Sequence, residues 1–179
     1  MSIKVRIRNI KKAVVGLICP PATQDLALNT KNRDATIKKY NYGPLNVDEP
    51  ADYWEKIAKF ISRKWKFKHL DSGLLYRRLA LILLNDKIET RDKNRIKKRI
   101  NEIKTISFQS SKNLRTQKIS QLASKIAIYQ FVRNYVNKLQ YDFVNKDKKI
   151  RGFVIDGRDI GSVVFKKADL KLYIEVNSK

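Results

Sequence analysis

The sequence predicts an α/β fold with a mostly parallel β-sheet flanked by helices. Short apolar segments typical of strands alternate with longer segments whose apolar residues recur every three or four positions, as in amphipathic helices. The two sharpest polar motifs, LDSGLLYRR and IDGRDIGSVVF, each begin where a predicted strand ends. Ligands of parallel sheets bind at the carboxyl ends of the strands. Both motifs therefore stand where a binding site is expected.

Length and composition indicate a soluble, folded protein. The chain has 179 residues, of which 42% are hydrophobic and 32% charged, enough for one domain with a sizeable core. No apolar run reaches the roughly 18–20 residues that a membrane-spanning helix needs. The single cysteine, Cys19, excludes an intramolecular disulfide and favours the cytoplasm. One histidine and one cysteine also argue against a zinc site, and no metal ligands are predicted.

The formal net charge of +23 would attract any polyanion. The lysines and arginines lie along the whole chain, however, so the charge is as typical of a compositional bias as of a dedicated surface. Nucleic-acid binding through this charge is expected to be non-specific.

The predicted elements follow from periodicity and from capping and turn residues. One or two short strands are expected within residues 3–19, and a loop after them up to residue 47. A cap at Thr116 and a break near Tyr129 are expected in the second helical block. The other expected elements are helices at 51–65, 74–85, about 91–104 and 117–144, and strands at 66–70, near 105–109, at 151–156 and at 170–176.

Several residues of the two motifs suit phosphate chemistry. Arg77 follows the Asp71–Gly73 turn by about one helical turn, and its planar guanidinium can grip a phosphate. Arg158 offers a second such group after Gly157. The plainer interpretation is that Arg77 only solvates a helix end and that Arg158 only pairs with a neighbouring aspartate in the turn.

Taken together and in this order, the motifs resemble those of the bacterial cytidylate kinases, which are (d)CMP kinases of the P-loop nucleoside monophosphate kinase class. The resemblance covers roughly residues 57–179. The family's D-[ST]-G-x-x-Y-R turn is matched by DSGLLYR, its S-x-x-[IL]-R-[ST] segment by SKNLRT, and its A-S-x-[VI]-A helix by ASKIA. The family's D/E-G-R-D-I-G-T-V-V-F phrase is matched by DGRDIGSVVF, and its next strand by ADLKLYI.

This resemblance implies the site residues and the reaction. Arg77 and Arg158 would bind the phosphate of CMP or dCMP and serve as the catalytic residues. Ser111, Arg115 and Asp159 would read the cytosine, and Asp71 and Tyr76 would shape the acceptor pocket. ATP with Mg²⁺ would donate the phosphoryl group.

The resemblance fails at the donor side. The family begins with a strand and a glycine-rich Walker A loop of the form G-P-x-x-S-G-K-G-T. Here VDEPADYWEKIAKFIS stands at that place, with bulky residues for the glycines, so cofactor-binding residues are unknown and Lys56 is only a weak candidate for the loop lysine. Beyond the strand at 170–176, the sequence has no counterpart of the family's arginine-rich lid.

The expected organisation is an N-terminal extension at 1–47, unmatched in the family, and an incomplete cytidylate-kinase-like domain at 48–179. A small inserted CMP-binding subdomain is expected at about 86–115. Three functions stay open: a (d)CMP kinase, a CMP-binding relic without turnover, and a basic nucleic-acid-binding protein. No membrane partner is expected.

Overall fold

The computed structural model describes residues 13–18, 52–146 and 149–173. The chain divides into two units. Of the described residues, those up to His69 and those from Ile150 onward form the sheet unit, and those of the continuous segment Leu70–Lys149 form the helical unit. The predicted loop up to residue 47 and the side chain of Lys56 lie outside what the structure describes.

The sheet has four strands in the order β2-β3-β1-β4. The strands are β1 Ala13–Ile18, β2 Lys68–Asp71, β3 Gly152–Gly157 and β4 Leu170–Tyr173. Strand β1 pairs in parallel with β3, with Ala13 opposite Gly152, and in parallel with β4, with Val15 opposite Leu170. Parallel pairs require crossover connections, so this arrangement confirms the α/β class. Strand β1 also places part of the segment expected as an extension inside the sheet.

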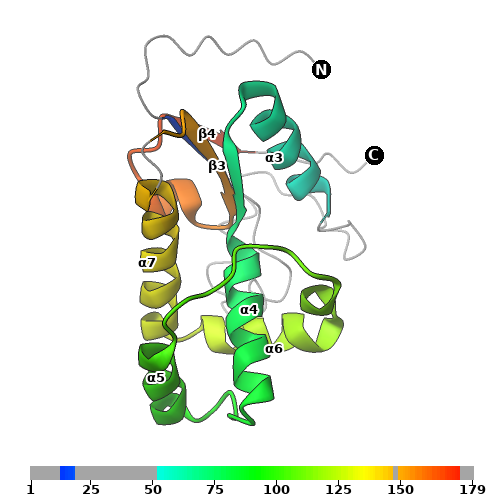
Figure 1. Cartoon of the computed structure of the whole chain (residues 1–179), viewed down its shortest axis with the longest axis vertical. Helices are drawn as coiled ribbons and strands as arrows, with labels where there is room; N and C mark the ends of the chain where they lie inside the picture. Colours follow the sequence, from blue (N-terminus) through cyan, green and yellow to red (C-terminus); the bar gives the residue numbers. More distant parts are fainter. Residues whose placement is uncertain (1–12, 19–51, 147–148, 174–179) are drawn as a thin grey trace, which may run out of the picture. The chain divides into compact units, whose positions relative to one another are not determined.

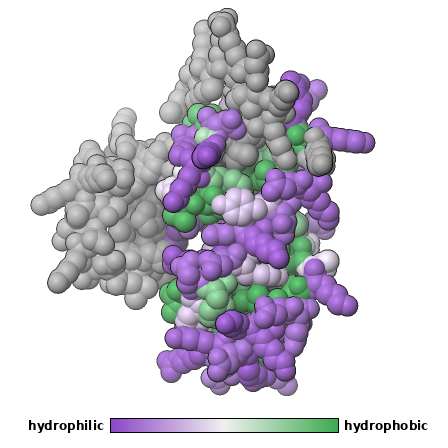
Figure 2. Space-filling view, turned by 90° about the vertical axis from the view of Figure 1, so that its left-hand side faces the viewer, coloured by the Kyte–Doolittle hydropathy of each residue, from purple (hydrophilic) through white to green (hydrophobic). Residues whose placement is uncertain are grey.

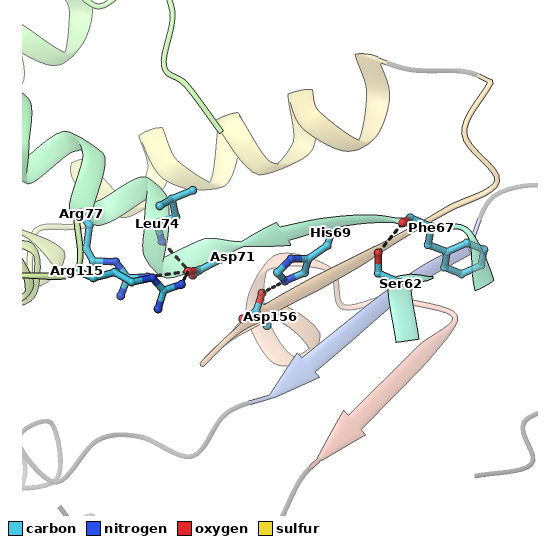
Figure 3. A network of polar contacts seen from close by, with 8 residues as sticks. All are labelled: Ser62, Phe67, His69, Asp71, Leu74, Arg77, Arg115 and Asp156. Atoms are coloured by element: carbon cyan, nitrogen blue, oxygen red, sulfur yellow. Dashed lines mark hydrogen bonds and ion pairs between the residues drawn. The ribbon is translucent and has the colours of Figure 1, made fainter. Parts of the chain in front are cut away.

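Helix α3 (Asp52–Trp65) packs against β3 within the sheet unit. Ala58 and Ile61 on α3 are buried against Val154 of β3, so the helix predicted at 51–65 packs one apolar face on the sheet. Lys66 has a positive φ of 56° and turns the chain out of the helix. The Ser62 hydroxyl donates a hydrogen bond to the Phe67 carbonyl at 2.7 Å (Figure 3). This bond fixes the turn that leads from α3 into β2.

Phe67 leaves no room for a side chain at Gly152, the first residue of β3. A Cβ at Gly152 would lie 2.5 Å from Cζ of the Phe67 ring. The ring also packs edge-on against Trp65, with centroids 5.7 Å apart. Glycine at this position therefore allows the aromatic pair to lie over the start of β3.

The helical unit has four α-helices and one 3₁₀ turn among its described residues: α4 Ser72–Asn85, α5 Lys93–Glu102, η1 Lys112–Arg115, α6 Gln117–Ala127 and α7 Gln130–Lys146. Helix α4 packs on α6 and α7, and α6 crosses it in Figure 1. Thr116 caps α6 through the Ile119 amide, and the chain breaks between α6 and α7 at Tyr129, as predicted. The core of this unit is Leu79, Ala80, Leu83, Ile96, Ile100, Ile119, Ala123, Ile126 and Val132.

The strand predicted near 105–109 is wrong. Residues 103–111 form no helix and no sheet ladder. Ile106 is buried, Phe108 is half-buried and Gln109 is exposed, so the apolar and polar positions do alternate as in a strand. The apolar side chains pack on helices instead: the Phe108 ring lies 5.1 Å from that of Phe143 on α7. An extended loop over helices gives the same period of two as a strand.

None of the described helices is long and apolar enough to cross a bilayer.

Candidate functional site

The turn between β2 and α4 gathers two arginines around one carboxylate. Asp71 accepts a hydrogen bond from the Leu74 amide at 3.0 Å through Oδ1, which caps α4. Its other oxygen, Oδ2, accepts from Nη2 of Arg77 at 2.7 Å. Nη2 of Arg115 lies 3.8 Å from the same oxygen. Figure 3 shows both guanidinium groups pointing toward the Asp71 carboxylate.

This group of charges is partly shielded from water. The side chains of Asp71 and Arg77 are 16% and 20% exposed, so their attraction is screened less than that of a surface pair. Among the described residues, Nε of Arg77 is buried without a hydrogen-bond partner. Two guanidinium groups on one carboxylate leave an excess positive charge, which favours the approach of an anion.

Gly73 lies close to the ion pair of Asp71 and Arg77. A Cβ at this position would lie 3.1 Å from Oδ1 of Asp71 and 3.5 Å from Nη2 of Arg77. A side chain there would crowd the Asp71 carboxylate, while its distance to Arg77 is that of an ordinary van der Waals contact. The glycine of the DSG turn is therefore tied to the geometry of Asp71 and Arg77.

The second part of the helical site is the turn η1, with Ser111 immediately before it. The Ser111 carbonyl accepts the Leu114 amide at 3.1 Å, and the Leu114 side chain is fully buried. This packing fixes the turn and leaves Ser111 exposed and Arg115 directed at Asp71. Of the predicted site residues, the structure thus brings together Asp71, Arg77 and Arg115. Tyr76 packs against the helical core, and its role in the acceptor pocket remains a prediction.

In the sheet unit, the IDGRDIGSVVF motif continues β3 into a tight turn. Asp156, the penultimate residue of β3, is buried. Arg158 is exposed and Asp159 half-buried. The Asp159 carbonyl accepts the amides of both Val163 and Val164, at 2.8 and 3.1 Å, at the start of a π-helical turn, Ile160–Val164. Turns of π-helix are rare in proteins, and many of those that occur lie at functional sites.

His69 is a site residue that the sequence reasoning missed. Its Nε2 lies 2.8 Å from Oδ1 of the buried Asp156, so a side-chain hydrogen bond joins β2 to the carboxyl end of β3 (Figure 3). The side chains are 15% and 8% exposed. The available signal was that the only histidine of the chain stands one residue before the LDSG motif.

We expect His69→Leu to lower the free energy of unfolding by about 1–3 kcal/mol, because a buried carboxylate loses a hydrogen-bond partner. His69→Gln keeps a donor of similar reach and should recover part of the loss. Urea denaturation of the three proteins measures the difference. Equal stability of the leucine variant and the unaltered chain would contradict this role.

The segment expected as the inserted subdomain is fixed to its neighbours at several points. Arg99 donates to Asp86 at 2.5 Å, and this hydrogen bond raises the pKa of Arg99. The Tyr129 hydroxyl donates to the Thr90 carbonyl at 3.0 Å. Helix α5 turns the charged side chains of Lys93, Arg95, Lys97 and Lys98 to solvent. Figure 2 shows the side of the molecule that carries α5 and α7, where hydrophilic residues dominate the lower part.

Within the described ranges, no three His, Cys, Asp or Glu side chains lie close enough together to hold a metal ion.

Comparison with known proteins identifies the family. The sequence profile of the cytidylate kinase family matches residues 45–179. The chain is 33% identical over 134 residues to a cytidylate kinase of Rickettsia akari (strain Hartford), covering 74% of this chain and 58% of that protein. It is 32% identical over 139 residues to a cytidylate kinase of Fusobacterium nucleatum subsp. nucleatum, covering 72% of this chain and 62% of that protein.

A longer relative shows the same match. The chain is 34% identical over 151 residues to a bifunctional pantoate ligase/cytidylate kinase of Prochlorococcus marinus (strain MIT 9215), covering 73% of this chain and 28% of that protein. These matches confirm the resemblance that the motifs indicated. The chain belongs to the cytidylate kinase family. It spans about 58% of the length of curated relatives such as the Rickettsia protein.

Proposed function

We propose that this chain binds CMP or dCMP as a phosphoryl acceptor and acts in the transfer of the γ-phosphoryl group of ATP to it. The observation that carries this proposal is the Asp71–Arg77–Arg115 group, in which two guanidinium groups meet at the end of a strand of a parallel sheet. Its residues coincide with motif positions of the cytidylate kinases, the family to which the chain belongs.

In this proposal Arg77 binds the phosphate of the nucleotide, and the family motif that contains Arg158 assigns the same ligand role to that residue. Arg77 is supported as a ligand by its shielded position and by its Nε, which no described residue engages. Asp71 keeps the guanidinium in place until the phosphate arrives. Ser111 and Arg115 would read the cytosine, and Tyr76 would line the pocket. The resemblance of its motif to the family assigns a base-reading role to Asp159 as well.

The chemistry requires little from the protein beyond position and charge. An oxygen of the acceptor phosphate attacks the γ-phosphorus of ATP, and the bond from that phosphorus to the oxygen bridging it to the β-phosphate breaks, which yields ADP. The arginines would neutralise the charge on the acceptor oxygens as the two phosphates approach. Mg²⁺ would enter with the phosphates of ATP, since this ion binds proteins through few carboxylates.

ATP is expected to bind weakly. The sequence has no glycine-rich loop whose backbone amides would surround the donor phosphates. Lys56 would be the only contribution from the segment at that position. A chain that binds CMP and transfers slowly is therefore consistent with the proposal.

A coupled assay of ADP formation, with and without CMP or dCMP, tests the proposal. We expect CMP-dependent turnover that falls by about a hundredfold or more in Arg158→Ala, because an acceptor phosphate would lose a charged ligand. Lys138→Ala, which removes an exposed charge of α7, serves as the matched control. If the unaltered chain shows no turnover, equilibrium dialysis with CMP decides: binding lost in Arg158→Ala supports a non-transferring CMP-binding chain, and no binding contradicts the proposal.

The exposed cations of α5 favour a second candidate, non-specific binding of nucleic acid. Lys93, Arg95, Lys97 and Lys98 lie on one exposed helix in a chain of net charge +23. Such binding would weaken steeply with salt, because it depends on the release of counterions. A titration of DNA at several salt concentrations, with and without CMP, separates this activity from the nucleotide site.

A further inference from the structure

A second arginine of α4 holds the segment that leads to η1. Arg78 follows Arg77 directly, and its Nη2 donates to the backbone carbonyl of Gln109 at 2.5 Å. The two residues are 31 positions apart in the sequence, so this hydrogen bond closes a long loop onto α4. Nε of Arg78 is buried and finds no hydrogen-bond partner among the described residues. The Arg78 side chain therefore acts mainly through this one charged hydrogen bond.

The segment 109–115 is fixed at both of its ends on the same part of α4. At its start, the Gln109 carbonyl is bound by Arg78. At its end, Leu114 is fully buried and Arg115 lies 3.8 Å from Asp71, the cap of α4. Helix α4 and η1 are in direct contact. Ser111 stands between the two fixed points: its carbonyl accepts the Leu114 amide of η1, whereas Gln109 and the residue after it belong to no helix or strand.

Little else holds the first of these points. The residues around Gln109 are exposed at 107 and 109–111, and the nearest apolar contact is the ring of Phe108 on Phe143. Among the described residues, the Gln109 amide bonds locally, to the Ser107 hydroxyl at 3.2 Å. Without the Arg78 hydrogen bond, the backbone at Gln109 would lose its position on α4, and Ser111 would be held from one side only, through its carbonyl bond to the Leu114 amide.

We infer that Arg78 is a positioning residue for base recognition: by binding the Gln109 carbonyl it sets the place of Ser111. This inference rests on the proposed function, in which Ser111 and Arg115 read the base. It assigns to the two neighbouring arginines of α4 separate tasks. Arg77 would serve the phosphate of the nucleotide, whereas Arg78 would touch no part of the nucleotide and act through the backbone of 109–111.

The test compares Arg78→Ala and Arg78→Lys with the unaltered chain and with Lys138→Ala, which removes an exposed charge of α7, as a charge-matched control. Calorimetry measures the affinity for CMP and for ribose 5-phosphate, which carries the phosphate and sugar without the base. We expect Arg78→Ala to bind CMP about tenfold more weakly and ribose 5-phosphate unchanged. Arg78→Lys, which retains a charged donor, should recover part of the CMP affinity. A merely structural role would lower both affinities together.

Amide hydrogen exchange without any ligand tests the positioning by itself. Peptides that cover 105–115 should exchange faster in Arg78→Ala, and those of α6 should not. Unchanged exchange would overturn the positioning role, whatever the binding data show. Faster exchange with an unchanged ratio of the two affinities would overturn the link to the base. If the unaltered chain binds neither ligand, the proposed function fails, and the base-reading role fails with it. The exchange result would still show whether Arg78 holds the backbone at Gln109.

Discussion

Arg77→Ala is expected to weaken CMP binding roughly 100-fold to 1,000-fold. A loss of this size is typical when one partner of a shielded, charged hydrogen bond is removed, here the bond between Arg77 and the CMP phosphate. Arg77 is the better shielded of the two arginines on Asp71, with 20% of its side chain exposed against 32% for Arg115. Calorimetric titration with CMP measures the change. The affinity for ribose 5-phosphate should fall by the same factor, because the lost contact is to the phosphate.

Two controls separate this effect from a damaged fold. In the Arg77→Ala variant, Asp71 still accepts the hydrogen bond from the Leu74 amide that caps α4. The melting temperature should therefore change little. Lys138→Ala removes one positive charge from the same unit at an exposed position and should leave CMP affinity within about twofold. Equal losses in Arg77→Ala and Lys138→Ala would mean that bulk charge alone attracts the nucleotide.

Gly152→Ala is expected to destabilise the protein by about 2 kcal/mol, which lowers the melting temperature by roughly 4–8 °C. The added methyl group would lie 2.5 Å from the Phe67 ring, so the ring or the start of β3 has to move. Because Gly152 pairs with Ala13 of β1, a shift of β3 also disturbs the neighbouring strand. Thermal and urea unfolding report the loss.

A double variant identifies the cause. Phe67→Leu alone removes part of the aromatic pair and should also destabilise the protein. If the collision with Phe67 is responsible, the alanine substitution should cost much less in the Phe67→Leu background than in the unaltered chain. Additive losses would mean that the Gly152 backbone, and not the ring, sets the cost.

The helices and their ends were readily predicted from the sequence. The apolar residues of α4 recur at helical spacing, and the Asp71 side chain that begins it stands in a small-residue turn. Thr116 and the break at Tyr129 are local features of the same kind. The failure at 105–109 has a physical reason as well. Ile106 and Phe108 alternate with polar residues because a loop rests on helices, and periodicity does not show whether a partner strand exists.

The contacts between the residues of the site were harder to predict than the residues themselves. Motif order pointed to Asp71, Arg77 and Arg115, but a motif does not tell which guanidinium meets which carboxylate. His69 and Asp156 are 87 positions apart, and Arg78 and Gln109 are 31 apart. Neither pair belongs to one motif, and the second involves a backbone carbonyl that any residue would supply. Only the path of the chain between the partners brings them together.

The order β2-β3-β1-β4 has a consequence for how the protein is made. The helical unit is one continuous stretch, Leu70–Lys149, and can fold from local contacts as soon as it leaves the ribosome. Strand β1 is synthesised earlier, yet its partners β3 and β4 follow at the far end of the chain. Closing so long a loop is slow. Throughout that interval the apolar segment AVVGLI has neither of its neighbours, so aggregation of nascent or refolding chains is expected to start there.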